Sequence, residues 1–222
     1  MIARNNILAT IRRNLAAVIP SGVTASESGR PVAALEPQAL IDRFSKELAR
    51  VDGEFIHVRD HAEGIKAIAQ VLAPVASCKV MVTGEELIVR QQYRNRLSAI
   101  LPPACTVVEW NGQGHNYVAT MDAGIVYAAG FVAETGTAVL IPSAHHARAA
   151  ALLPEMLIIV GTTAQLAYDT DTILARIKSA GGFTAASSLV LMTGPSRTSD
   201  IEKILVKGVH GPRRVVVVLV DR

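Results

Sequence analysis

A stretch near the end of the chain combines anion-binding side chains with turn-forming residues. Residues 192–212 read MTGPSRTSDIEKILVKGVHGP, where three glycines and two prolines surround hydroxyl, guanidinium and carboxylate groups. A simple connection between two elements needs only a residue such as Gly or Asn in order to turn. The composition therefore predicts a site for a carboxylate or a phosphate. Its candidate ligands are Ser196, Arg197, Thr198, Asp200 and His210.

The same stretch also has a purely structural interpretation. We expect a short helix to begin near residues 196–199, and the free N–H groups of such a helix attract anions. Ser199 and Glu202 have the spacing of a capping box, which needs no ligand. Arg197 is not explained in this way, because a cation is unfavourable at a helix N-terminus unless it faces an anion. His210, between two glycines, is open to both interpretations.

A second candidate lies in residues 131–142, FVAETGTAVLIP. Glu134 interrupts an apolar stretch, and a carboxylate there needs a partner or a raised pKa. Thr135, Gly136 and Thr137 follow at once, and they offer two hydroxyl groups and a close backbone approach for an anion. Glu134 is therefore a candidate catalytic nucleophile or acid/base group. The alternative is a strand-end glutamate that hydrogen-bonds its own turn through the threonines.

The elements that must position these residues alternate along the chain. Short aliphatic runs predict strands at 54–58, 78–83, 105–110, 124–128, 138–141, 156–160, 188–192 and 215–220. Helical patterns fall at 38–50, 61–73, 85–100, 145–153 and 170–180. This order predicts an α/β fold with a mostly parallel sheet and helices on both faces. Both candidate stretches should then leave the carboxyl edge of one sheet, where ligands bind, and face one pocket.

The N-terminal part reads differently from the rest. Residues 3–17 have helical periodicity, and the following segment is rich in Ser, Gly and Pro. We therefore expect residues 1–36 to form a helical arm with a linker, and residues 37–222 to form the α/β domain. The arm is expected to dock on its own domain or on a partner, which leaves a homo-oligomer open.

Composition excludes several classes of protein. The net charge of +3 arises from 22 basic and 19 acidic residues, without a basic stripe interleaved with aromatics, so nucleic acid is not an expected partner. The two cysteines, Cys78 and Cys105, have no metal-ligand spacing, so neither a metal nor an iron–sulfur cluster is expected in this chain. No apolar run approaches about 18 residues, which predicts a cytoplasmic protein without a membrane span.

Four short motifs occur in order along the chain: AETGT at 133–137, LLP at 152–154, GPSRTSDIE at 194–202 and GVHGP at 208–212. With these motifs, and with ILATIRRNL near the N-terminus, the sequence resembles the LUD-domain family and its lactate utilization protein C group. The resemblance implies a fold like that of the NagB/RpiA/CoA-transferase group. It also implies a role in oxidising L-lactate to pyruvate together with partner subunits that carry iron–sulfur clusters.

Three functions follow from these observations. The leading interpretation is an accessory subunit of an L-lactate utilization system that binds a small anionic ligand and has no cofactor of its own. The rival is a stand-alone enzyme of the CoA-transferase or cyclo-ligase kind that uses Glu134, and the third is a ligand-sensing regulator. A redox role without a partner is not expected, because VTGEEL at 82–87 lacks the glycines of a dinucleotide-binding turn.

Overall fold

The computed structural model describes residues 6, 9, 10, 13, 35–75, 77–84, 87–182, 188–199 and 205–221, with the backbone alone at 87–89, 198–199 and 205–207. The chain divides into two units, Met1–Ala34 and Leu35–Arg222. In the first unit, the four residues that are described are helical. The second unit contains the elements described below.

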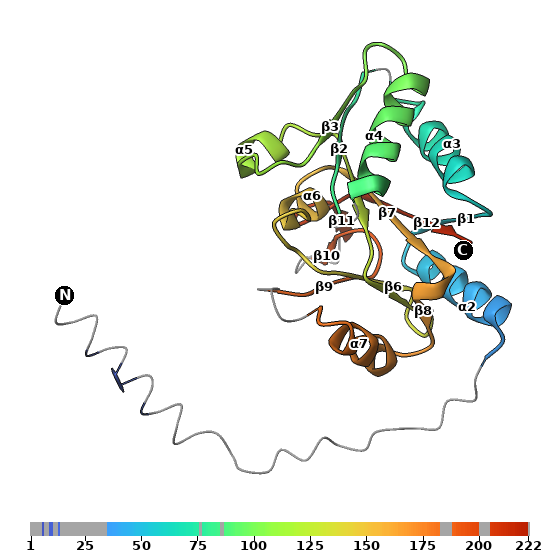
Figure 1. The fold of residues 1–222 in the computed structure, drawn as a ribbon, viewed down its shortest axis with the longest axis vertical. Coiled ribbons are helices and arrows are strands. Elements are labelled where there is room, and N and C mark those ends of the chain that lie inside the picture. Colours follow the sequence, from blue (N-terminus) through green and yellow to red (C-terminus); the bar gives the residue numbers. More distant parts are fainter. Residues whose placement is uncertain are drawn as a thin grey trace. The chain divides into compact units, whose positions relative to one another are not determined.

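Six parallel strands form the main sheet, in the order β1-β12-β7-β4-β2-β3 (Figure 1). This sheet confirms the α/β class that the alternating runs predict. The strands are rich in Val, Ile and Leu because both faces of such a sheet are covered. Their bounds are β1 Glu54–Val58, β2 Lys79–Val82, β3 Thr106–Glu109, β4 Ala123–Tyr127, β7 Met156–Thr162 and β12 Arg214–Val220.

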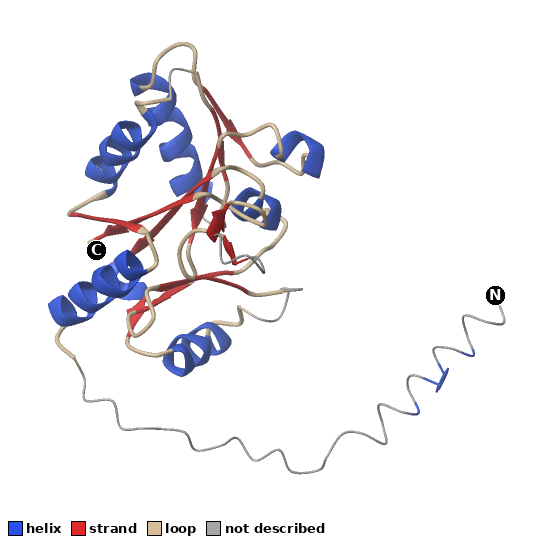
Figure 2. Cartoon of the chain, turned by 180° about the vertical axis from the view of Figure 1, so that it is seen from behind, coloured by secondary structure: helices blue, strands red, loops and turns tan. Residues whose placement is uncertain are grey.

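Helices cover both faces of this sheet (Figure 2). Alternate residues of β12 face opposite sides, as the pleat requires: Val216 and Val218 pack with α3 and α4, whereas Val215 and Val217 pack with α2 and α6. The helices are α2 Pro37–Arg50, α3 His61–Leu72, α4 Leu87–Ile100, α5 His115–Val118, α6 Arg148–Leu152 and α7 Thr170–Ser179. Helix α2 starts at a proline, and Asp60 caps α3 by accepting a hydrogen bond from the N–H of Glu63 at 2.8 Å.

A second, four-stranded sheet has the order β8-β5-β6-β9, and a short 3-10 turn, Thr163–Gln165, precedes β8. It consists of β5 Gly130–Val132, β6 Thr137–Leu140, β8 Leu166–Ala167 and β9 Val190–Met192, and β6 is antiparallel to both of its neighbours. One face packs in the same core as α2 and α6 through Phe131, and the other packs on α7 through Val132. The runs 138–141 and 188–192 are therefore strands, but they do not belong to the parallel sheet.

Residues 197–199, near which a helix was expected to begin, are extended. Arg197–Ser199 is strand β10, which pairs in antiparallel register with β11, Leu205–Lys207. The N–H of Ser196 donates to the carbonyl oxygen of Pro212 at 2.9 Å, and the N–H of Gly208 donates to the carbonyl oxygen of Ser196 at 3.0 Å. These bonds to distant residues hold residues 196–199 extended, and the residues that would follow Ser199 in a capped helix, 200–204 with Glu202 among them, lie outside the described residues.

The two cysteines meet at the amino ends of β2 and β3. Cys78 is 1% exposed, and its Sγ donates to the Sγ of Cys105 at 2.7 Å. Burial, followed by the hydrogen bond to Cys105, raises the pKa of the Cys78 thiol from 9.0 to about 12. The protonated thiol is therefore the form that the folded protein stabilises.

This raised pKa predicts a loss of stability at alkaline pH. Between about pH 9 and 12 the unfolded chain releases the Cys78 proton while the folded chain keeps it. The free energy of unfolding should therefore fall as pH rises, by at most about 1.4 kcal/mol per pH unit for this group. Urea unfolding at pH 8, 9 and 10 measures the slope. In Cys78→Ala the slope should be shallower than in the wild type, and equal slopes would contradict the prediction.

Candidate functional site

The topology of the parallel sheet defines a crevice between β2 and β4. These strands are neighbours, but the chain leaves β2 through α4 toward β3 on one side, and leaves β4 toward β7 on the other. Ligands of open α/β sheets bind at the carboxyl ends of strands where the connections diverge in this way. The crevice at this position is lined by Val82, Thr83, Gly84, Arg90, Tyr93, Ile125, Val126, Tyr127 and Val160.

The floor of the crevice is held in place by backbone hydrogen bonds. Thr83 is 2% exposed, and its hydroxyl group donates to the carbonyl oxygen of His145 at 2.8 Å and accepts from the N–H of Ala147 at 3.0 Å. The N–H of Gly84 donates to the same His145 carbonyl at 3.0 Å. The loop before α6 is thereby fixed against the end of β2. Because the only donor of the Thr83 hydroxyl is already engaged by His145, this group positions the crevice and cannot donate to an anion.

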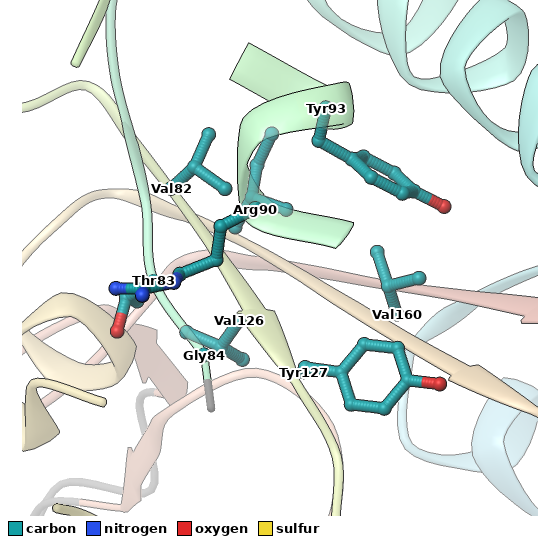
Figure 3. A pocket seen from close by; sticks show the side chains of 9 residues that line it. Val82, Thr83, Gly84, Arg90, Tyr93, Val126, Tyr127 and Val160 are labelled. Atoms are coloured by element: carbon teal, nitrogen blue, oxygen red, sulfur yellow. The ribbon is translucent and has the colours of Figure 1, made fainter. Parts of the chain in front are cut away.

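Arg90 is the group at this site that best fits an anion. It lies on α4, and its side chain is 8% exposed. Its Nε lies 3.6 Å from Oε1 of Glu109, which is an ion pair beyond hydrogen-bond range, and this buried Nε has no hydrogen-bond partner. Buried polar atoms are nearly always bonded in proteins, so an orphaned donor beside a crevice calls for a ligand or a solvent molecule. In Figure 3 the guanidinium end projects toward Thr83.

The rest of the crevice is apolar apart from two phenols. Tyr93 is 1% exposed, and its hydroxyl group hydrogen-bonds Nδ1 of His61 at 3.0 Å. Burial raises the pKa of Tyr93, so the phenol keeps its proton at neutral pH. The hydroxyl groups of Tyr93 and Tyr127 both point away from Arg90 (Figure 3). The crevice itself has a volume of only about 10 Å³, which is room for about one solvent molecule, so a carboxylate bound by Arg90 has to approach from outside the crevice.

The sequence-predicted residues lie elsewhere, around the end of α2. The turn of Thr135 and Gly136 joins β5 to β6, and residues 193–196 follow β9 at the same edge of the four-stranded sheet. The hydroxyl groups of Thr135 and Thr137 lie 2.7 Å apart, and those of Thr137 and Thr193 lie 2.6 Å apart. The two stretches are thus neighbours, and the anion pocket that they were expected to share stays a prediction. The edge that they share belongs to the antiparallel sheet and not to the parallel one, because the chain changes sheets after β4.

Close packing fixes this threonine cluster against α2. Gly136 has a φ of +65° and leaves no room for a β-carbon beside the backbone of Leu48. Gly194 packs on Val51 in the same way, with its own φ of +83°. Both turns are therefore shaped by contact with the C-terminal end of α2. Because the hydroxyl groups of Thr135, Thr137 and Thr193 bond one another, these three threonines and the two glycines are explained by packing without a ligand.

The charged candidates of the two stretches do not meet as expected. Arg197 bonds Oδ2 of Asp52 at 2.9 Å through its guanidinium group. Glu134 is exposed, its N–H donates to the carbonyl oxygen of Tyr168 at 2.8 Å, and its carboxylate has no bonded partner within the described part of the chain. Ser196 is half-buried and His210 is exposed. The Thr198 side chain and Asp200 lie outside the described residues, so their assignment as ligands stays a prediction.

Sequence reasoning missed the crevice residues. Thr83 and Gly84 follow an aliphatic run, as do Glu109 and Trp110, and both pairs stand at carboxyl ends of parallel strands. Their position at the ends of aliphatic runs is a signal for a ligand site. VTGEEL at 82–87, which contains Thr83 and Gly84, was interpreted only as lacking the glycines of a dinucleotide-binding turn. Arg90 carries no such signal, because α4 contains two further arginines, Arg94 and Arg96, which are exposed. Only the packing of the helix shows which of the three is buried.

The described residues contain neither a membrane-spanning helix nor a metal-binding cluster. No helix among them has the length and apolar character that a membrane crossing requires. Likewise, no group of three or more His, Cys, Asp or Glu side chains gathers within the described ranges as a metal-binding cluster.

The fold and the sequence together place the chain in a family. The model of the LUD domain matches residues 41–220, and the chain belongs to this family. The solved structure of a DUF162 family protein from Deinococcus radiodurans shares the fold, with a TM-score of 0.62 at 21% identity over 84% of this chain and 99% of that one.

Relatives with curated names come from two bacterial groups. The Escherichia coli K12 protein YkgG is 26% identical over 200 residues, which cover 84% of this chain and 82% of that protein. Lactate utilization protein C of Bacillus pumilus is 25% identical over 195 residues, with 84% and 80% covered. Lactate utilization protein C of Bacillus subtilis strain 168 is 36% identical over 104 residues, which span 45% of this chain and 42% of that one.

Proposed function

We propose that this chain is an accessory subunit of a lactate utilization system and binds a small carboxylate at Arg90, beside the crevice between β2 and β4. Membership of the LUD domain family and the relatives named lactate utilization protein C support the role. The buried Arg90, with its unpartnered Nε at the switch point of the sheet, is the observation that carries the binding proposal. L-lactate and pyruvate are the carboxylates that this role makes relevant.

The electron-transfer centres of such a system are proposed to lie in partner subunits. Iron–sulfur clusters usually take four cysteine ligands, and this sequence contains two cysteines. Their Sγ atoms contact each other at the amino ends of β2 and β3, at the opposite edge of the sheet from the crevice. The chain's own contribution is then to bind and orient the acid, for which a buried guanidinium group is suited because it can bond both carboxylate oxygens.

Glu134 supports a second candidate function, a stand-alone enzyme in which this carboxylate reacts. Its exposure and its lack of a bonded partner in the described region leave it accessible to a substrate. Against this, Glu134 lies on the turn of the four-stranded sheet and does not line the crevice. We therefore retain the binding subunit as the leading function and let the following experiment separate the two.

Reconstitution of lactate oxidation tests the proposal. The purified chain alone should not reduce an electron-acceptor dye with L-lactate. A mixture of the iron–sulfur partner subunits should gain at least about tenfold in rate when the chain is added, because an oriented substrate reacts faster. Glu134→Gln should restore this rate as well as the wild type does. A chain that oxidises lactate alone, or that changes nothing in the mixture, overturns the accessory role, and loss of turnover in a folded Glu134→Gln protein favours the enzyme.

A further inference from the structure

A cleft beside Arg90 is larger than a three-carbon acid requires. It has a volume of about 770 Å³ and opens between α4, the carboxyl end of β3, the following loop and the loop before α6. Clefts that hold cofactor-sized or drug-sized ligands span about 300–1,000 Å³. Lactate or pyruvate would leave most of this volume to solvent, so the dimensions indicate a larger ligand. The residues used below are Arg90, Arg94, Glu109, Trp110, Gln113 and Tyr117, which all line the cleft.

One wall of the cleft is cationic. Arg90 and Arg94 are one helical turn apart on α4, so their side chains project from the same face of the helix. Arg94 is exposed, and its guanidinium group forms no ion pair or hydrogen bond within the region that the structure describes. Arg90 is buried and has its unpartnered Nε. Two guanidinium groups at this spacing suit a group with two negative charges and several acceptor oxygens, which describes a phosphate.

Another part of the lining is aromatic, and hydrogen bonds order its tryptophan and the loop that follows. The indole Nε1 of Trp110 donates to the carbonyl oxygen of Ala144 at 2.9 Å, which fixes the ring. Gln113 holds the loop that follows β3. Its Oε1 accepts a hydrogen bond from the N–H of Asn111 at 2.8 Å, and its Nε2 donates to the carbonyl oxygen of Glu109 at 3.1 Å. Tyr117 of α5 is 42% exposed. A planar ring can stack on such a wall with little loss of side-chain entropy, because the wall does not have to be ordered on binding.

From these two walls we infer that the cleft binds a nucleoside phosphate. The phosphate lies at Arg90 and Arg94, and the base lies against Trp110 and Tyr117. Glu109, whose side chain is 21% exposed, is placed to accept a hydrogen bond from a sugar hydroxyl group. The inference shares Arg90 with the proposed function, because this residue borders both the crevice and the cleft.

The indole in the cleft provides the measurement. Trp110 is the single tryptophan of the sequence, so tryptophan fluorescence, excited where the four tyrosines do not absorb, reports on this site alone. Titration with ADP should give a saturable change, and calorimetry on the same protein should give the same dissociation constant. Adenosine, which lacks the phosphates, and ribose 5-phosphate, which lacks the base, should each bind at least about tenfold more weakly than ADP, since each loses contacts worth about 1.4 kcal/mol or more.

Variants on α4 locate the phosphate. Arg94→Ala should weaken ADP binding by about tenfold, since one charge-assisted hydrogen bond is lost. Arg96→Ala removes the same charge from an exposed position of the same helix that does not line the cleft, and it should leave the affinity within about twofold. Trp110→Phe should remove the fluorescence change while calorimetry still detects ADP.

Several results would overturn the inference. These are the absence of ADP binding in calorimetry, equal binding of ribose 5-phosphate and ADP, and equal effects of Arg94→Ala and Arg96→Ala. The lactate-oxidation mixture is measured separately. If the chain stimulates that mixture but does not bind ADP, the cleft inference fails and the accessory role stands. If ADP binds but the chain does not stimulate the mixture, the accessory role fails and the cleft inference stands.

Discussion

Replacing Arg90 by methionine is expected to reduce the affinity for pyruvate by about 100-fold while the protein remains folded. A guanidinium group that bonds both oxygens of a carboxylate contributes two charge-assisted hydrogen bonds, each worth about 1.5–3 kcal/mol. Loss of both corresponds to a factor of about 100 or more in the dissociation constant. Isothermal titration of pyruvate, and separately of L-lactate, measures this change.

The fold should survive this substitution because Arg90 contributes little to stability in the free protein. Its Nε is buried without a hydrogen-bond partner, and its ion pair with Glu109 has a separation of 3.6 Å. Removal of one partner of an ion pair is strongly destabilising only where the other charge is left buried and uncompensated. Glu109 remains 21% exposed, so water can solvate it after the change. Thermal unfolding of the variant checks this requirement before its affinity is interpreted.

Two other arginine variants serve as controls for the position of the site. Arg96→Met removes a charge from the exposed face of α4 and should leave the affinity for pyruvate unchanged. Arg197→Ala breaks the ion pair with Asp52, whose side chain is 52% exposed, so its effect on stability should stay below about 1 kcal/mol and its effect on binding should be small. If Arg197→Ala abolishes binding and Arg90→Met does not, the anion site lies at the threonine cluster, as the sequence predicted.

Replacing Gly124 by alanine is expected to cause a large loss of stability. Gly124 is in the middle of β4, and a β-carbon there would overlap the carbonyl oxygen of Ala150 in α6. Because this neighbour is backbone, the helix itself has to move away from the sheet. Overpacking of this kind costs about 3 kcal/mol, which lowers the melting temperature of a chain of this size by about 6–12 °C.

Gly114→Ala is the matched control for this change. A β-carbon at Gly114 meets nothing within 4 Å, and its φ of −68° suits any residue. Its melting temperature should therefore stay within about 2 °C of the wild type, since surface changes usually alter stability by less than about 0.5 kcal/mol. Equal melting temperatures of Gly124→Ala and Gly114→Ala would show that α6 does not pack directly on β4. Differential scanning calorimetry of both variants makes the comparison.

Much of the fold was predictable because its signal is local and repeated. Aliphatic runs separated by helical patterns predicted the strands β1, β2, β3, β4, β7 and β12, together with the helices that cover them. Each run is buried on both faces of a parallel sheet, so its composition differs clearly from that of a helix or a turn. The change of sheet at β5 was not predictable, since a short aliphatic strand reads alike in a parallel and in an antiparallel sheet.

Residues 197–199, near which a helix was expected to begin, form a strand. Capping-box spacing is a weak preference of a few residues, whereas the pairing of Arg197 with Lys207 and the bond from Ser196 to Pro212 come from distant parts of the chain. The tertiary bonds determined the conformation. The same reason explains Arg197 itself, because its partner Asp52 lies far away in sequence at the end of α2.

The sequence by itself determined the alternation of strands and helices, the motifs of the family and the two polar stretches that the threonine cluster brings together. Tertiary structure decided which charges are free and which are engaged. It paired Arg197 with Asp52, buried Arg90 without a hydrogen-bond partner for its Nε, and placed Thr83, Gly84 and Tyr127 at the point where connections from β2 and β4 diverge. Burial and pairing depend on which distant segments pack together. No local sequence pattern therefore shows that Arg90 is buried while Arg94 and Arg96 on the same helix are exposed.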